Sequence, residues 1–64
     1  MRGYIEVEKH NGRDSFLIYQ EDGLPVAVVS DFMWNEMKDM YNVDVESESF
    51  VEDVHFYLEK VFFN

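Results

Sequence analysis

The sequence contains no cysteine, one proline, three glycines and only five Lys and Arg in 64 residues. Without cysteine, the chain can form neither a disulfide nor a thiolate zinc site. The three glycines are dispersed, so no glycine-rich loop is available to cradle a phosphate. The scarcity of basic residues argues against direct binding to nucleic acid, because Lys and Arg supply most of the affinity for phosphates.

Long apolar segments are also missing. The run from Val26 to Val29 is far too short to span a membrane, and residues 1–30 have no basic stretch followed by a long apolar run. We therefore expect no membrane partner and no signal peptide. The absence of cysteine fits a reducing compartment, and we expect the protein to act in the cytoplasm of a host cell.

Acidic and aromatic residues are abundant instead. The chain has 14 Asp and Glu, a formal net charge of -9, and 17% aromatic residues. This aromatic content argues against disorder despite the charge. The length predicts one domain, residues 1–64, which is too small for a deep catalytic cleft.

The first half of the chain predicts an antiparallel sheet. Asn11-Gly12 lies between the alternating segments 4–10 and 15–20, and both central residues of a type I′ hairpin turn need positive φ. The resulting pairs are Ile5 with Ile18, Val7 with Phe16, Lys9 with Asp14, Tyr4 with Tyr19, and Glu6 with Leu17.

A third strand is predicted after a second turn at Asp22-Gly23. Its core, Val26 to Val29, leaves the register open because all four residues are apolar. The face that carries Tyr4, Leu17 and Tyr19 is too apolar to be left in water, so we expect a cover or a partner there.

Two helices are predicted in the second half of the chain. Ser30 is an N-cap candidate for the first helix, and Asn42 is expected to end it. Ser49-x-x-Glu52 matches the capping box of a second helix from about Phe50 to Phe62. The apolar stripes comprise Met33, Trp34, Met37, Met40 and Tyr41 in the first helix, and Phe50, Val51, Val54, Tyr57, Leu58 and Val61 in the second.

Residues 43–48 form either a loop or a short fourth strand. The predicted fold is α+β: a small single domain with a meander of three strands, or alternatively four, followed by two helices.

The acidic residues concentrate in the second half. Between Lys38 and Lys60 the chain has seven Asp and Glu residues and no Lys or Arg. One interpretation is a surface that imitates the phosphates of nucleic acid and binds a basic partner. The alternative is a solvated face that keeps the protein soluble. The acids assigned to partner binding are Asp44, Glu46, Glu48, Glu52, Asp53 and Glu59.

Two phenylalanines accompany these acids. Phe56 and Phe63 fall with Glu52 and Glu59 on the helical face opposite the predicted core stripe. Aromatic anchors with a polar surround are typical of protein interfaces, so we assign Phe56 and Phe63 to partner binding or dimerisation. The alternatives are a helix clamped between two layers, or a terminus at which Phe63 frays.

No catalytic or metal-binding pattern is found. Counting from Asp44, the sixth and twelfth positions are Ser49 and His55, where a calcium-binding EF-hand needs Gly and Glu. His10 is most simply a turn residue and His55 a structural one. We therefore expect no catalytic residue, no metal and no cofactor, and a protein that is not an enzyme.

Two resemblances add to this interpretation. The segment from Asp22 to Ser30, followed by a helix with Trp34 and Met37, resembles the strand-then-helix part of prevent-host-death antitoxins over residues 22–41. That family places a DNA-binding helical segment before the strands, where this chain has a hairpin, so DNA binding is not carried over. In size, acidity, aromatic content and α+β build, the chain is similar to small bacteriophage inhibitors of the anti-CRISPR and DNA-mimic type.

The resulting hypothesis is a non-enzymatic binding protein. It would inhibit or modulate a nucleic-acid-handling host protein, such as a CRISPR effector, nuclease or polymerase, by occupying its basic surface. The alternative is an antitoxin-like or assembly subunit that acts through apolar contacts and homodimerisation.

Overall fold

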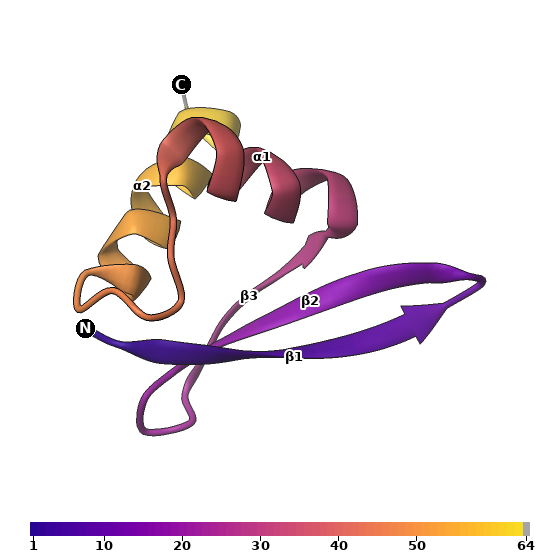
Figure 1. Cartoon of the computed structure of the whole chain (residues 1–64), viewed down its shortest axis with the longest axis horizontal. Coiled ribbons are helices and arrows are strands. Elements are labelled where there is room, and N and C mark those ends of the chain that lie inside the picture. Colours follow the sequence, from indigo (N-terminus) through magenta and orange to yellow (C-terminus); the bar gives the residue numbers. More distant parts are fainter. Residues whose placement is uncertain (64) are drawn as a thin grey trace.

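A computed structural model describes residues 1–63 and shows a three-stranded antiparallel sheet with two helices on one of its faces (Figure 1). The elements are β1 (Gly3–His10), β2 (Arg13–Gln20), β3 (Pro25–Ser30), α1 (Asp31–Tyr41) and α2 (Phe50–Phe62). The strand order β1-β2-β3 places β2 in the centre. The predicted α+β meander followed by two helices is therefore confirmed.

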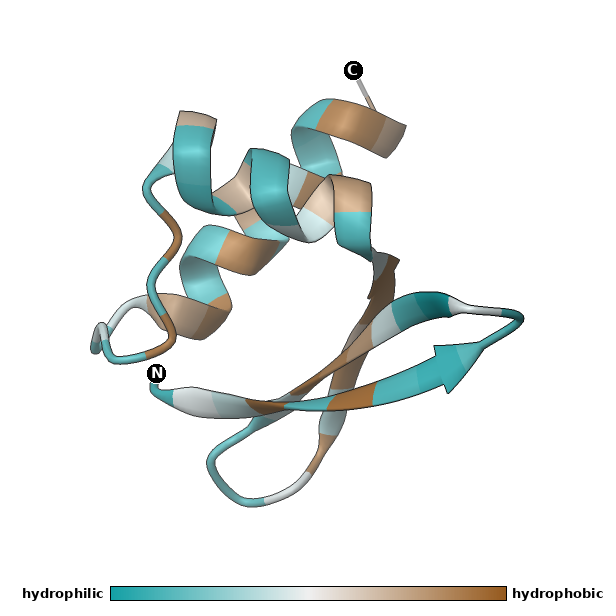
Figure 2. Ribbon diagram, turned by 45° about the vertical axis from the view of Figure 1, so that its right-hand side comes forward, coloured by the Kyte–Doolittle hydropathy of each residue, from teal (hydrophilic) through white to brown (hydrophobic). Residues whose placement is uncertain are grey.

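The hairpin of β1 and β2 turns at Asn11-Gly12, as predicted. Both residues have positive φ, 52° at Asn11 and 79° at Gly12, as a type I′ turn requires. The pairs include Ile5 with Ile18, Val7 with Phe16, and Lys9 with Asp14. Figure 2 shows that the hydrophilic tip of this hairpin projects beyond the helices.

The structure specifies the register of strand β3, which the sequence left open. The pairs are Phe16 with Val29, Leu17 with Val28, and Ile18 with Ala27. Ala27 and Val29 therefore face the helices, whereas Val28 lies on the uncovered face with 68% of its surface exposed. A register shift next to Tyr19 then places Pro25 opposite that residue.

Helix α1 begins and ends at the predicted capping residues. The Ser30 hydroxyl accepts a hydrogen bond from the backbone N–H of Met33 at 3.2 Å. Asn42 ends the helix in the left-handed conformation, with φ of 56°, and donates its N–H to the carbonyl of Met37. Each cap pairs a backbone group that would otherwise lack a partner at the helix end.

Helix α2 has the predicted bounds, but the predicted capping box is wrong. Ser49 makes no side-chain cap hydrogen bond, and its ψ of 18° differs from the extended backbone usual at an N-cap. Its hydroxyl donates to the Asp53 carboxylate at 2.8 Å, and Glu52 turns to the amino group of Met1. The carbonyl of Met1 instead accepts the N–H of Val51 at 3.0 Å, so the first residue of the chain helps to cap α2.

Close packing next to this cap requires a glycine. A Cβ atom at Gly3 would collide with the carbonyl oxygen of Tyr19 and lie 3.1 Å from the ring of Phe50. Gly3 therefore lets β1 approach both β2 and the start of α2.

Two residues that were predicted to face the core are exposed. Met40 is 73% exposed and Val61 is 44% exposed. Both lie in the last turn of a helix, whereas the last fully buried residues, Met37 and Tyr57, come one turn earlier. The apolar stripe of each helix thus runs past the part of the molecule against which it packs.

Residues 43–48 form a loop, and the described part of the chain has no fourth strand, so that alternative is wrong. Val43 is buried, and its N–H donates to the carbonyl of Met37 at 3.0 Å. Val45 packs against the core in part. The alternation that suggested a strand therefore reflects a loop with valines turned inward and acids turned outward.

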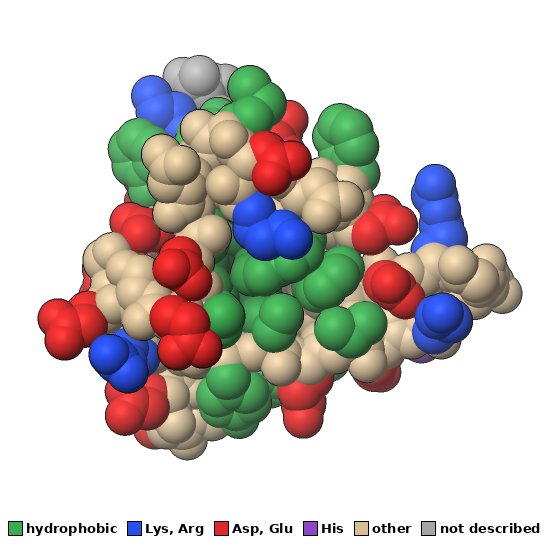
Figure 3. All heavy atoms as spheres, in the orientation of Figure 1, with side chains coloured by type: hydrophobic (Ala, Val, Ile, Leu, Met, Phe, Trp, Pro, Cys, Tyr) green, Lys and Arg blue, Asp and Glu red, His purple; other side chains and the backbone are tan. Residues whose placement is uncertain are grey.

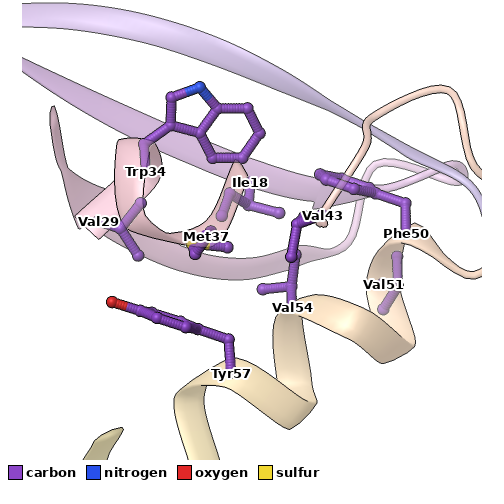
Figure 4. Close-up of a cluster of buried hydrophobic side chains, with 9 residues drawn as sticks. All are labelled: Ile18, Val29, Trp34, Met37, Val43, Phe50, Val51, Val54 and Tyr57. Atoms are coloured by element: carbon purple, nitrogen blue, oxygen red, sulfur yellow. The ribbon is translucent and has the colours of Figure 1, made fainter. Parts of the chain in front are cut away.

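The core lies between the sheet and the helices (Figure 4). It consists of nine buried residues: Ile18, Val29, Trp34, Met37, Val43, Phe50, Val51, Val54 and Tyr57. Trp34 stacks on Phe16 of the central strand with ring centroids 5.5 Å apart. Helix α2 contributes four of the nine residues, so its opposite face is turned away from the core.

Candidate functional site

The acidic loop before α2 carries the first part of the predicted site. Asp44, Glu46 and Glu48 are all exposed. The Asp44 carboxylate accepts the N–H of Glu46 at 3.0 Å, and the Asp44 carbonyl accepts the N–H of Ser47 at 2.9 Å. Within residues 1–63, Glu46 and Glu48 form no ion pair, so their charges are open to solvent.

Two further acids at the start of α2 are engaged within the chain. Glu52 forms an ion pair with the amino group of Met1, and this hydrogen bond lowers the pKa of the Glu52 carboxyl. Asp53 is half-buried and accepts the hydroxyl of Ser49. Figure 3 shows acidic side chains (red) gathered on the left, with a basic side chain (blue) among them. The ammonium group of Met1 offsets the charge of Glu52, so the local charge is less negative than the number of acids suggests.

The outward face of α2 carries the aromatic part of the predicted site. Phe56 is 54% exposed and Phe63 is 83% exposed. With Glu59 and Lys60 they line an open hollow of about 460 Å³. The ammonium nitrogen of Lys60 lies 5.5 Å from the centroid of the Phe56 ring. Three of the predicted residues, Phe56, Glu59 and Phe63, thus lie together.

Sequence reasoning missed Lys60 as a residue of this surface. Lys60 was treated only as the end of the acidic segment, although at helical spacing it lies next to Phe56. Elsewhere on the two helices, the side chains of Phe32, Met40 and Phe62 are also more than half exposed. The run of apolar residues from Val61 to Phe63 was a signal that the end of α2 exposes apolar surface.

The outer face of the sheet is a second exposed apolar surface. Tyr4 and Tyr19 stack across β1 and β2 with ring centroids 5.0 Å apart, and Val28 is largely exposed beside them. A hollow of about 350 Å³ next to these residues is lined by Leu17, Ile18, Tyr19, Pro25, Val26, Ala27 and Val28. Both helices lie on the other side of the sheet, so no element of residues 1–63 covers this face (Figure 1).

The histidines and acids of residues 1–63 include no group of three that could hold a metal ion. His10 lies 3.9 Å from a Glu8 carboxylate oxygen near the hairpin turn, and His55 is exposed on α2. None of the described helices has the length and apolar character needed to cross a membrane.

Comparison of the chain with protein-family models, with curated proteins and with solved structures found no match. The resemblances to phage inhibitors and antitoxins therefore stay predictions. The features that bear on function are the outward face of α2 with the acidic loop before it, and the outer face of the sheet.

Proposed function

We propose that this chain is a non-enzymatic binding protein that inhibits or modulates a nucleic-acid-handling protein of its host by covering that protein's basic surface. The observation that carries the proposal is the exposed pair of Phe56 and Phe63 beside Glu59, on a helix that starts at the acidic loop. Apolar anchors surrounded by charge are typical of interfaces, and complementary potentials accelerate association.

The partner would carry Lys and Arg, as a CRISPR effector, nuclease or polymerase does where it holds nucleic acid. Glu46 and Glu48 would supply charge, and Phe56 and Phe63 would supply buried contact area. Such a protein would act in the cytoplasm of the host cell. It would not bind nucleic acid itself, because its few Lys and Arg residues are outnumbered by Asp and Glu.

The test isolates the partner from a bacterial lysate at low salt and measures whether the chain lowers the partner's affinity for duplex DNA. We expect competition that weakens as salt rises, because the screening length falls from about 10 Å at 0.1 M to about 3 Å at 1 M. The double variant Glu46→Lys/Glu48→Lys should lose this competition without a change in circular dichroism.

A matched control changes the charge equally on the sheet. The variant Glu6→Lys/Glu8→Lys alters two exposed acids of β1, away from the acidic loop. It should retain most of the competition. Equal losses in the two double variants would contradict the assignment of the loop, and a partner whose DNA binding is unaffected would contradict the proposal.

The outer face of the sheet favours a second candidate function, an antitoxin-like or assembly subunit. Tyr4, Leu17, Tyr19 and Val28 would bury against a second copy or a cognate protein, since a contiguous apolar face of this kind often marks an interface. Sedimentation at several concentrations tests it. A dimer that dissociates in Val28→Glu but not in Phe56→Ala would support this function.

A further inference from the structure

The hollow on α2 combines aromatic rings with an acid. Lys60 already places its ammonium group within cation–π distance of the Phe56 ring, at 5.5 Å from the centroid. Glu59 lines the same hollow, and within residues 1–63 its carboxylate forms no ion pair. The hollow therefore presents an aromatic surface that a cation occupies and a carboxylate that is open to a second cation.

We propose that this hollow binds an arginine side chain of a partner protein, with the guanidinium stacked on Phe56 or Phe63 and paired with Glu59. Arginine suits the hollow better than lysine, because its planar group is weakly hydrated, stacks on aromatic faces and pairs with a carboxylate through two hydrogen bonds. The inference rests on the proposed function, since it names the group by which a basic partner is held.

Lys60 has the role of an internal competitor in this arrangement. Its ammonium group occupies the face of Phe56 and adds a positive charge to the hollow. An exposed cation–π contact of this kind is weak, so an incoming guanidinium displaces the ammonium into solvent. Removal of the Lys60 charge should therefore strengthen the binding of arginine.

The experiment uses two fluorescent peptides of equal length, one with six arginines and one with six lysines, each spaced by Gly and Ser. Fluorescence anisotropy measures their binding to the full chain at low and high salt. We expect the arginine peptide to bind about three- to five-fold more tightly than the lysine peptide, as an exposed cation–π contact allows. The variants Phe56→Leu and Glu59→Gln should each reduce this ratio towards one.

Lys38 supplies the matched control for Lys60. It also lies over an aromatic ring, with its nitrogen 5.9 Å from the centroid of Trp34, and Lys38→Gln changes the net charge by the same amount. We expect Lys60→Gln to raise the affinity for the arginine peptide more than Lys38→Gln does. Equal increases would show that only net charge matters and would overturn the role of Lys60.

The outcomes separate this inference from the proposed function. Salt-sensitive binding of both peptides with equal affinity, unchanged by Phe56→Leu, overturns the arginine site and leaves the acidic surface supported. Absence of salt-sensitive binding to either peptide overturns both. Circular dichroism of each variant confirms that the fold is retained, which is expected because Phe56, Glu59 and Lys60 all point away from the core.

Discussion

At the scale of single residues, Tyr57 has the most demanding environment. It is 1% exposed, and its hydroxyl donates a hydrogen bond of 2.7 Å to the Glu36 carboxylate of α1. Its ring also meets Tyr41 edge-on, with centroids 5.0 Å apart. Burial, together with Glu36, raises the pKa of Tyr57 to about 12. One phenol thus joins the two helices by packing and by a hydrogen bond.

We expect Tyr57→Phe to lower the free energy of unfolding by about 1–2 kcal/mol, because a hydrogen bond to a charged group is lost. The wild-type protein should lose stability as pH rises from 10 to 12, since the unfolded chain releases the Tyr57 proton at the lower pH. The variant should lack this part of the decline. Urea unfolding at pH 7, 10 and 11.5 measures both effects.

The control for this prediction is Tyr41→Phe. The hydroxyl of Tyr41 makes no hydrogen bond with the described residues, so its removal should change stability by less than about 0.5 kcal/mol. Equal effects of the two substitutions would contradict the assigned role of the bond between Tyr57 and Glu36.

At the scale of elements, the two helices begin in different ways although both follow a serine. Ser30 has an extended backbone, with ψ of 167°, and its hydroxyl reaches the N–H of Met33. The backbone of Ser49 directs its hydroxyl to Asp53. The carbonyl of Met1 accepts a backbone N–H at the start of α2 instead. The same residue type is a cap in one helix and a surface side chain in the other.

We therefore expect Ser30→Ala to cost about 1 kcal/mol of stability, the usual effect of losing an N-cap. Ser49→Ala should cost less than about 0.5 kcal/mol, as is usual for exposed positions outside such features. Urea unfolding of the two variants measures the difference directly. If Ser49→Ala lost more stability than Ser30→Ala, the capping box of Ser49 and Glu52 would have to form in solution.

At the scale of the whole molecule, a net charge of -9 is confined to 64 residues. The ion pairs of residues 1–63 are few and exposed: Met1 pairs with Glu52 and Lys9 with Asp14, and the contact of His10 with Glu8 adds a third only when the imidazole is protonated. Exposed pairs contribute little to stability, whereas like charges repel one another throughout the compact state. The acidic surface that is proposed to bind a partner therefore destabilises the free protein.

We expect the melting temperature to rise by about 2–5 °C when NaCl is increased from roughly 0.02 to 0.3 M, because screening reduces this repulsion. The neutralised variant Glu46→Gln/Glu48→Gln should melt higher at low salt and respond less to NaCl. Differential scanning calorimetry measures both. A melting temperature that falls with NaCl would mean that attractive ion pairs outweigh the repulsion.

The candidate site could be predicted in part. Phe56, Glu59 and Phe63 were placed on one outward face because helical spacing is local information, and the structure brings them together. The engagement of Glu52 by Met1 could not be predicted, because 51 positions separate the two residues. The exposure of Met40 and Val61 also depended on where the packing partners of each helix end.

The sequence by itself determined the hairpin turn at Asn11-Gly12, the register of β1 with β2, and the bounds of both helices. Turn chemistry, capping at Ser30 and apolar periodicity act between near neighbours, so they can be recognised along the chain. Only the tertiary structure decided the register of β3, the burial of Val43 and the cap on α2. These depend on contacts between distant segments, and such contacts exist only once the sheet and helices have packed together.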